Sequence, residues 1–247
     1  MTQYKLVALD MDGTLLNESG QISEGNKRAI REALDAGVTV SFSTGRGFPS
    51  AYPFAEELGL LHTPMVTVNG GEVWKTPNEL HLRRVMDAAL VRRLHVLVSR
   101  YDVWYWAYST EGIYNTERWI DDIDSTSWLK FGVHSEDDAS RNEILNTIRG
   151  WGGMEITNSS PVNIEINPIG VNKAVGMQEM CKLLGIDMSQ AIAVGDSLND
   201  IAAIREAGLG VAMGNAQDAV KEAADYVTAS NEEDGVAEVI HKFVLGR

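Results

Sequence analysis

Short apolar runs alternate with amphipathic stretches in the first third of the chain and again in the last third. An apolar run of this length without polar interruption is typical of a buried strand, whereas the stretches between the runs have helical periodicity. The predicted strands lie at residues 6–9, 38–42, 64–68, 191–194, 210–213 and 226–228. Strands that alternate with helices predict a doubly wound parallel sheet of the α/β class, with right-handed crossovers.

The middle of the chain has a different pattern. A hairpin is predicted at residues 72–82, followed by two helices at residues 87–100 and 138–149. Short strands are predicted around these helices, at residues 103–108, 113–115, 128–133, 154–157 and 162–166. This order predicts an inserted α+β domain with antiparallel strands at residues 83–168. Residues 1–82 and 169–247 would then form the core.

One predicted strand of the inserted domain carries aromatic residues on both faces. Trp104, Trp106 and Tyr108 share one of these faces. They could stack on a sugar or another ring, or they could pack the helices of the domain onto its sheet. We favour packing as the interpretation.

Composition narrows the classes of partner and location. The net charge of -14 opposes binding to nucleic acid or to an anionic membrane surface, and any phosphate site must be locally positive. The single cysteine, Cys181, fits a reducing cytoplasm. No apolar run approaches the roughly 18 residues that a membrane span requires. The sequence therefore predicts a cytoplasmic protein with a small-molecule partner.

Polar residues follow four of the predicted strands at the point where each strand ends. These residues are Asp10 and Asp12, Thr44 with Arg46, Asn69, and Asp196 with Asn199 and Asp200. Because the carboxyl ends of parallel strands meet at one edge of a sheet, four acids are expected to converge there. Without a cation, repulsion and desolvation would destabilise such a cluster by roughly several kcal/mol, the usual cost of burying charged groups. Oxygen ligands of this kind suit Mg²⁺.

The same residues suggest phosphoryl chemistry. One acid of the Asp10 and Asp12 pair can attack phosphorus while the other exchanges a proton with the leaving group. Lys173 lies in the first turn of a predicted helix, where the helix dipole disfavours a cation. A residue that breaks a local rule in this way is a candidate for function, here as the partner of the acids. Thr44 can hydrogen-bond a phosphate oxygen.

These motifs resemble those of a known family. Residues 10–14, residues 43–46, Lys173 and residues 195–200 resemble, in order and spacing, the four motifs of the haloacid dehalogenase superfamily. Residues 211–216, 225–228 and 234–236 resemble the Cof-type phosphatases of that superfamily. The resemblance covers the core, whereas the inserted domain matches only in outline.

The resemblance implies a role for each motif residue. Asp10 would be the nucleophile that forms an aspartyl-phosphate, and Asp12 would protonate the leaving oxygen and later activate water. Mg²⁺ would be held by the carboxylates of Asp10 and Asp196 and by the backbone carbonyl of Asp12, with Asp200 ordering the shell. The phosphate-binding residues would be Thr44, Gly45, Lys173 and Asn199. The inserted domain would be a cap that closes over the site and selects the substrate.

The leading hypothesis is a Mg²⁺-dependent phosphatase that acts on a small phosphorylated metabolite such as a sugar phosphate, as a monomer or a homodimer. A phosphomutase on the same fold stays open. A phospho-accepting receiver module is a further alternative, but Asp12 argues against it because a second acid promotes loss of the phosphoryl group. A non-catalytic relative is disfavoured because every motif acid is present.

Overall fold

The computed structural model describes residues 3–247, which form two compact units. The described residues up to Leu82 together with Asn172–Arg247 form the first, here called the core unit. Arg83–Val171 form the second, the inserted unit. The second boundary thus follows residue 171, whereas the sequence placed it after residue 168.

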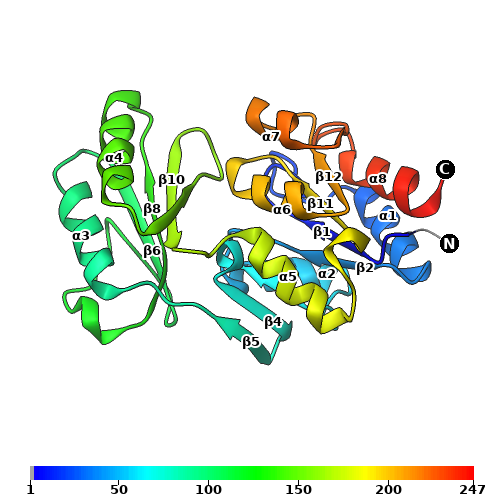
Figure 1. The fold of residues 1–247 in the computed structure, drawn as a ribbon, viewed down its shortest axis with the longest axis horizontal. Coiled ribbons are helices and arrows are strands. Elements are labelled where there is room, and N and C mark those ends of the chain that lie inside the picture. Colours follow the sequence, from blue (N-terminus) through cyan, green and yellow to red (C-terminus); the bar gives the residue numbers. More distant parts are fainter. Residues whose placement is uncertain (1–2) are drawn as a thin grey trace. The chain divides into compact units, whose positions relative to one another are not determined.

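The core unit is built on a five-stranded parallel sheet (Figure 1). Its strands are β1 (Leu6–Leu9), β2 (Thr39–Phe42), β11 (Ala191–Gly195), β12 (Leu209–Ala212) and β13 (Tyr226–Val227). They follow the order β13-β12-β11-β1-β2, and every neighbouring pair is parallel. All residues of β1 and β11 are buried, which explains their uninterrupted apolar runs.

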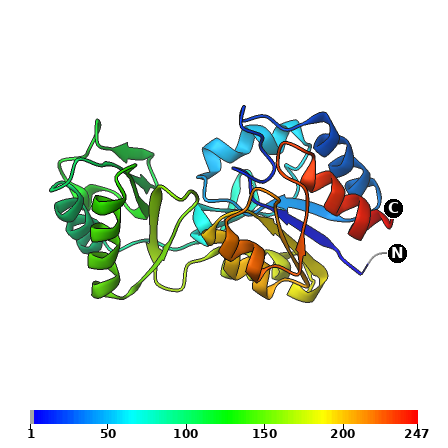
Figure 2. The ribbon, with the colours of Figure 1, turned by 90° about the horizontal axis from the view of Figure 1, so that it is seen from above.

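Helices cover both faces of this sheet. They are α1 (Glu24–Asp35), α2 (Phe48–Glu57), α5 (Lys173–Leu184), α6 (Ile201–Glu206), α7 (Asp218–Ala223) and α8 (Gly235–Val239), which a π-helical turn extends at Ile240–Leu245. Figure 2 shows α1, α2 and α8 on one side of the sheet and α5 and α6 on the other. Ser23 begins α1 by accepting a hydrogen bond from the backbone N–H of Asn26. Among the described residues, no helix combines the length and the apolar character needed to cross a membrane.

One predicted strand of the parallel sheet lies elsewhere. β3 (Met65–Thr67) forms a separate three-stranded sheet with β4 (Glu72–Thr76) and β5 (Glu79–Arg83), and it pairs with β4 antiparallel. A single parallel bridge, Ser43 to Val66, links β3 to the chain that follows β2. The prediction of a full parallel strand was therefore wrong, because the tight turn after β3 leads the chain straight back along it.

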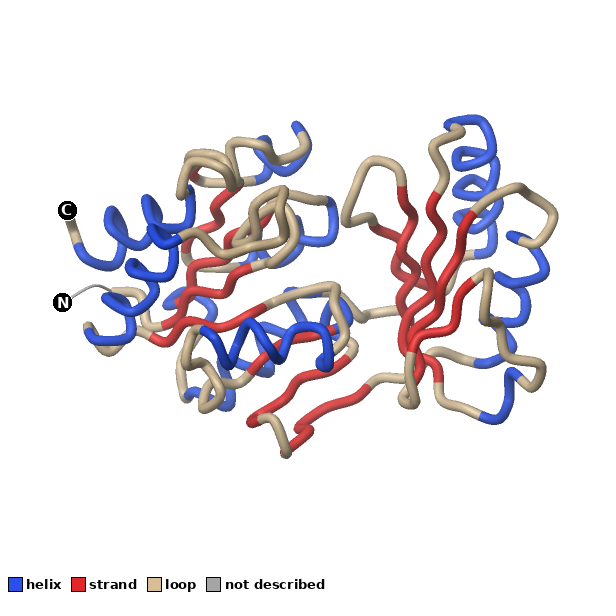
Figure 3. The backbone as a smooth tube through the Cα atoms, turned by 180° about the vertical axis from the view of Figure 1, so that it is seen from behind, coloured by secondary structure: helices blue, strands red, loops and turns tan. Residues whose placement is uncertain are grey.

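The inserted unit is a five-stranded antiparallel sheet with two helices. Its strands are β6 (Trp104–Ser109), β7 (Ile113–Asn115), β8 (Trp128–His134), β9 (Met154–Thr157) and β10 (Asn163–Pro168), in the order β7-β6-β8-β10-β9. Figure 3 shows its helices, α3 (Ala88–Val98) and α4 (Asp138–Trp151), on one face of this sheet. The structure therefore has the fold class that the sequence predicted, a parallel α/β core with an inserted α+β domain.

The aromatic residues of β6 do not pack as we expected. Tyr105 and Ala107 belong to the apolar cluster that α3 and α4 cover, whereas Trp104, Trp106 and Tyr108 do not. Trp106 lies over Gly132 of the neighbouring strand, where a Cβ atom would come within 2.2 Å of its indole. The interpretation that these aromatic residues pack the helices onto the sheet was wrong. Trp104 stacks on Trp106 and is 42% exposed.

A buried ion pair joins two strands on the same face as Trp106. Lys130 Nζ of β8 lies 2.7 Å from Glu165 Oε1 of β10, and both side chains are almost fully buried. Lys130 Nζ also lies 4.8 Å from the centre of the Tyr108 ring. Removal of one member leaves the other as an uncompensated buried charge.

We expect Lys130→Met to lower the free energy of unfolding by about 3–5 kcal/mol, the usual cost of breaking a buried pair. The double variant Lys130→Met/Glu165→Leu should recover most of this loss, since it removes both charges. Denaturant unfolding followed by tryptophan fluorescence reports mainly on the inserted unit, because Trp74 alone of the tryptophans lies outside it. The exposed pair Arg92–Asp124 supplies the control, and Arg92→Met should cost under about 1 kcal/mol.

Candidate active site

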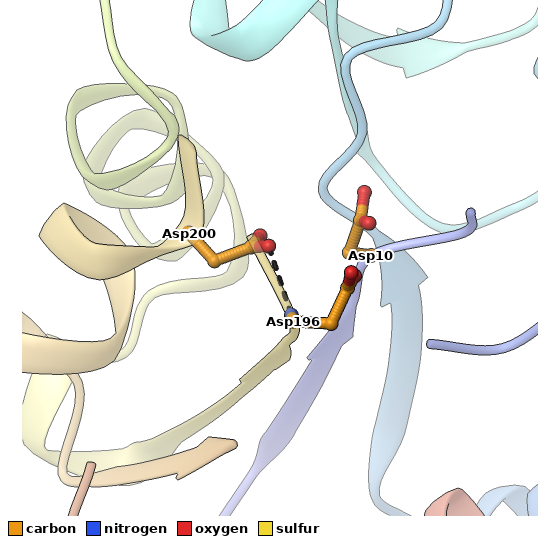
Figure 4. A group of neighbouring side chains, drawn as sticks. All are labelled: Asp10, Asp196 and Asp200. Atoms are coloured by element: carbon orange, nitrogen blue, oxygen red, sulfur yellow. Dashed lines mark hydrogen bonds between the residues drawn. The ribbon is translucent and has the colours of Figure 1, made fainter. Parts of the chain in front are cut away.

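Three carboxylates meet at the carboxyl edge of the parallel sheet. Asp10 follows β1 and Asp196 follows β11, and these two strands are neighbours with Leu9 in register with Val194. Asp200 comes from the turn Leu198–Asp200 that follows. One oxygen from each acid lies within 4.8 Å of the others. Figure 4 shows these acids extending from two adjacent strand ends and the following turn.

Lys173, the first residue of α5, supplies the positive charge of this cluster. Its Nζ donates to Asp10 Oδ1 at 2.6 Å and to Asp200 Oδ1 at 2.7 Å, and its side chain is 0% exposed. Burial lowers the pKa of Lys173, but the two carboxylates outweigh burial and raise it above its ordinary value. Lys173 is therefore a permanently charged bridge between the two acids.

Burial and neighbouring negative charges raise the pKa values of two of the acids, Asp10 and Asp196. Burial raises the pKa of Asp10 well above 3.8, and the charges of Asp200 and Asp196 act in the same direction against Lys173. Burial and the charge of Asp200 raise the pKa of Asp196 to about 6. When all groups are ionised, three carboxylates face one ammonium and leave an excess of two negative charges.

Asp200 is fixed in place by the chain around it. Its Oδ2 accepts hydrogen bonds from the backbone N–H groups of Asp196 and Ser197, each at 3.1 Å. The side chain folds back over Gly195, where a Cβ atom would come within 2.2 Å of the Asp200 carboxyl carbon. Glycine is therefore required at position 195, and Asp200 acts as a rigid support for Lys173.

Two hydroxyl groups that the sequence analysis did not single out hold Asp196. Thr14 Oγ1 donates to Asp196 Oδ1 at 3.0 Å, and Ser197 Oγ donates to Oδ2 at 2.9 Å. Gly13 has φ +76° and lies so close to Asp196 that a Cβ atom would clash at 2.6 Å. A hydroxyl residue next to each acidic motif was the available signal.

The cluster fits a divalent cation. Carboxylate oxygens are the ligands that hard divalent cations prefer, and the excess of two negative charges matches the charge of such an ion. The buried Oδ1 of Asn199 has no hydrogen-bond partner among the described residues. An acceptor left in this way is suited to a water molecule in the shell of an ion.

The side chain of Asp12 does not belong to the cluster of Asp10, Asp196 and Asp200. Its carboxylate accepts two hydrogen bonds from the Arg46 guanidinium, from Nε at 2.8 Å and from Nη2 at 2.6 Å. The Asp12 side chain is 55% exposed, in contrast to the buried Asp10. A metal contact from Asp12 would therefore have to come through its backbone carbonyl, as the family resemblance implies.

The predicted phosphate-binding residues lie on the neighbouring loops. Thr44 is buried, its N–H donates to Val66 O at 3.0 Å, and its Oγ1 accepts from the Arg46 N–H. Gly45 lies in the same turn. Asn199 is buried, and its Nδ2 donates to Asn69 Oδ1 at 3.2 Å. The structure therefore brings Asp10, Lys173, Asp196 and Asp200 into direct contact or near contact, with Thr44 and Asn199 on adjoining loops.

Sequence comparison assigns the chain to a family. A family model described as haloacid dehalogenase-like hydrolase matches residues 7–147 and 118–240. The chain is 47% identical over 241 residues to 5-amino-6-(5-phospho-D-ribitylamino)uracil phosphatase YcsE of Bacillus subtilis. The alignment covers 98% of this chain and 96% of that protein. It is 32% identical to the B. subtilis protein of the same activity named YitU, with 98% of each chain covered.

Comparison of structures gives the same result. A solved haloacid dehalogenase-like hydrolase from B. subtilis superposes with a TM-score of 0.86 at 26% identity, and covers 96% of this chain and 98% of that one. The acid cluster, the lysine that bridges it and these relatives all indicate the same family. The chain belongs to the haloacid dehalogenase-like hydrolases and is a Cof-type phosphoric monoester hydrolase.

Proposed function

We propose that this phosphatase forms an aspartyl-phosphate on Asp10, requires Mg²⁺, and hydrolyses the 5-phosphate of a ribityl-linked aminouracil. The observation that carries the chemistry is the buried Lys173 bridge between Asp10 and Asp200. Because Lys173 binds Oδ1 of Asp10, we propose that the other oxygen, Oδ2, is the one that attacks the phosphoryl group. The fixed carboxylate is thus oriented before the substrate arrives.

Mg²⁺ would be held by the carboxylates of Asp10 and Asp196 and by the backbone carbonyl of Asp12. Asp200 would help to order the ligands around the ion. Their oxygen donors and excess negative charge support this assignment. When bound, the ion would offset the charge of the acids and of the incoming phosphate, so that the attacking carboxylate and the dianion can approach.

Two displacements at phosphorus follow from this arrangement. Asp10 attacks phosphorus, the bond to the ester oxygen breaks, and Asp12 donates a proton to the departing oxygen. Asp12 then takes a proton from water, which attacks phosphorus, releases inorganic phosphate and regenerates Asp10. The exposure of the Asp12 carboxylate supports both of its proposed roles. An exposed carboxylate can exchange Arg46 for the leaving group in the first step and for water in the second.

The substrate proposal rests on the relatives. YcsE and YitU carry names that specify 5-amino-6-(5-phospho-D-ribitylamino)uracil, and YcsE matches nearly the whole of this chain. This compound is a phosphorylated sugar alcohol joined to a ring, so it falls within the class of small phosphorylated metabolites. We further propose that the inserted unit acts as the cap that selects this substrate.

Mg²⁺ should raise the thermal stability of the protein through the acid cluster. At a Mg²⁺ concentration about 100 times its dissociation constant, the stabilisation should be about 2.7 kcal/mol. Differential scanning calorimetry with and without EDTA measures this effect. Asp196→Asn should abolish most of it, whereas Asp102→Asn, at an exposed acid of the inserted unit, should leave it intact. An equal Mg²⁺ response in the Asp196→Asn variant would contradict the proposed metal site.

The metal-free protein should lose stability as pH rises from 5 to 7.5 because of Asp196. Its pKa in the folded protein is about 6, above the ordinary 3.8, so the folded state binds this proton more tightly than the unfolded state. The stabilisation is therefore present at low pH and is lost as pH rises through about 6. Denaturant titrations in EDTA should show a decrease about 1 kcal/mol larger in the wild type than in Asp196→Asn. Parallel pH profiles for the two proteins would exclude this explanation.

Asp10→Asn should abolish phosphate release from 5-amino-6-(5-phospho-D-ribitylamino)uracil, with a loss in kcat of about a thousandfold or more, because the amide cannot act as the nucleophile. Colorimetric phosphate release in the presence of Mg²⁺ measures this rate, and Asp102→Asn should retain full activity. Full activity in Asp10→Asn would refute the proposed intermediate.

The same assay separates the remaining alternatives. A higher kcat/KM for sugar phosphates than for the ribityl compound would replace the substrate while retaining the phosphatase. Rearranged sugar phosphate without release of inorganic phosphate would indicate a phosphomutase.

A further inference from the structure

The turn after β3 has an unusual backbone. Three consecutive residues have positive φ angles, namely Val68 at 54°, Asn69 at 57° and Gly70 at 92°. Valine rarely adopts this conformation because its branched Cβ is crowded there, whereas asparagine and glycine tolerate it. A conformation of this kind persists only where the surroundings hold it, and it is enriched at functional sites.

Backbone hydrogen bonds tie this turn to the loop that carries Thr44. The N–H of Asn69 donates to the carbonyl of Thr44 at 3.0 Å, and the N–H of Val68 donates to the carbonyl of Arg46 at 2.9 Å. In return, the N–H of Thr44 donates to Val66 O at 3.0 Å. The positive φ angles direct these N–H groups toward the loop, so the backbone of the turn sets the position of Thr44.

The turn also touches the start of α5. A Cβ atom on Gly70 would lie 2.1 Å from the carbonyl oxygen of Asn172, so only glycine allows this approach. Asn172 caps the helix by accepting a hydrogen bond from the N–H of Val175, and Lys173 is the first residue of that helix. Gly70 therefore packs directly against the residue that precedes Lys173.

The side chain of Asn69 makes the third connection. Its Oδ1 accepts a hydrogen bond from Asn199 Nδ2 at 3.2 Å, and both residues are buried. Because an amide group is planar, this one bond sets the direction of the second N–H of Asn199. It also sets the direction of Asn199 Oδ1, which has no partner among the described residues.

We propose that Asn69 is a positioning residue for phosphate binding, which orients Asn199 through its amide and Thr44 through its backbone. Glycine would satisfy the positive φ angle equally well. The amide of asparagine, however, adds the contact to Asn199, so position 69 carries two separable roles. This inference rests on the proposed function and on the expectation, implied by the family resemblance, that Thr44 and Asn199 bind the phosphate group.

Asn69→Gly separates the two roles, because it retains the backbone conformation and removes only the amide. We expect the dissociation constant of inorganic phosphate, measured by calorimetry at saturating Mg²⁺, to rise about tenfold, because a misdirected Asn199 would lose one hydrogen bond to the phosphate. KM for the phosphorylated substrate should rise by a similar factor. The melting temperature should fall by only about 2–4 °C, because the buried Asn199 Nδ2 loses its partner while the backbone conformation is retained.

A double-mutant cycle tests whether Asn69 acts through Asn199. Asn199→Ala should weaken phosphate binding at least as much as Asn69→Gly, and the double variant should bind phosphate within about twofold of Asn199→Ala alone. Asp234→Gly is the matched control, since Asp234 also has a positive φ, 58°, and accepts a side-chain hydrogen bond, from Ser23. This control should leave phosphate affinity unchanged.

The outcomes separate failure of this inference from failure of the proposed function. Unchanged phosphate affinity in Asn69→Gly, or losses that add in the double variant, would overturn the positioning role while wild-type turnover continues. Wild-type protein that binds phosphate but releases none from any phosphomonoester would refute the proposed function alone. If Asn69→Gly unfolds, exchange of the Asn199 side-chain amide protons with solvent in the wild type decides the matter, since fast exchange would show that Asn69 does not hold that amide.

Discussion

The site depends on one buried ammonium group. Lys173 binds Asp10 and Asp200 at the same time and is fully shielded from solvent. Desolvation of a lysine is costly, so its charge persists there only because two carboxylates compensate it. The same bonds keep one oxygen of Asp10 occupied and fix the carboxylate in direction. The position of Lys173 at the start of α5, unfavourable for the helix dipole, is the local cost of this arrangement.

The charged part of the site could be predicted from sequence because simple rules place it. Apolar runs marked β1 and β11, and residues that follow neighbouring parallel strands must meet at one edge. The sequence therefore predicts that Asp10 and Asp196 lie together. Lys173 was detectable for a different reason, since a lysine at a helix start contradicts local propensity. The family resemblance added individual roles to residues that these rules had already brought together.

The rest of the site depends on contacts that leave no periodic signal. β4 runs back antiparallel to β3 because the residues between the two strands have positive φ angles. One of these residues is Val68, and valine rarely adopts a positive φ angle, so the sequence does not predict this turn. The hydrogen bond from Thr14 to Asp196 joins residues 182 positions apart, so only the folded chain reveals it. On β6, aromatic residues on both faces gave no indication of which face the helices cover. In the folded protein, Trp106 lies over Gly132 of the neighbouring strand, a contact that the sequence pattern does not show.

The two acids of the first motif are placed in opposite environments. Asp10 is buried and bound by the fully buried Lys173, whereas Asp12 is half-exposed and bound by Arg46, whose own side chain is partly exposed. Fixed orientation would favour the role proposed for Asp10 as the nucleophile, because the reacting atoms must align. The role proposed for Asp12, as an acid that later acts as a base, requires instead that it exchange partners within each turnover, and a solvent-screened pair costs little to break. The spacing of two residues, which lets the chain bend at Gly13, is what allows one loop to supply both environments.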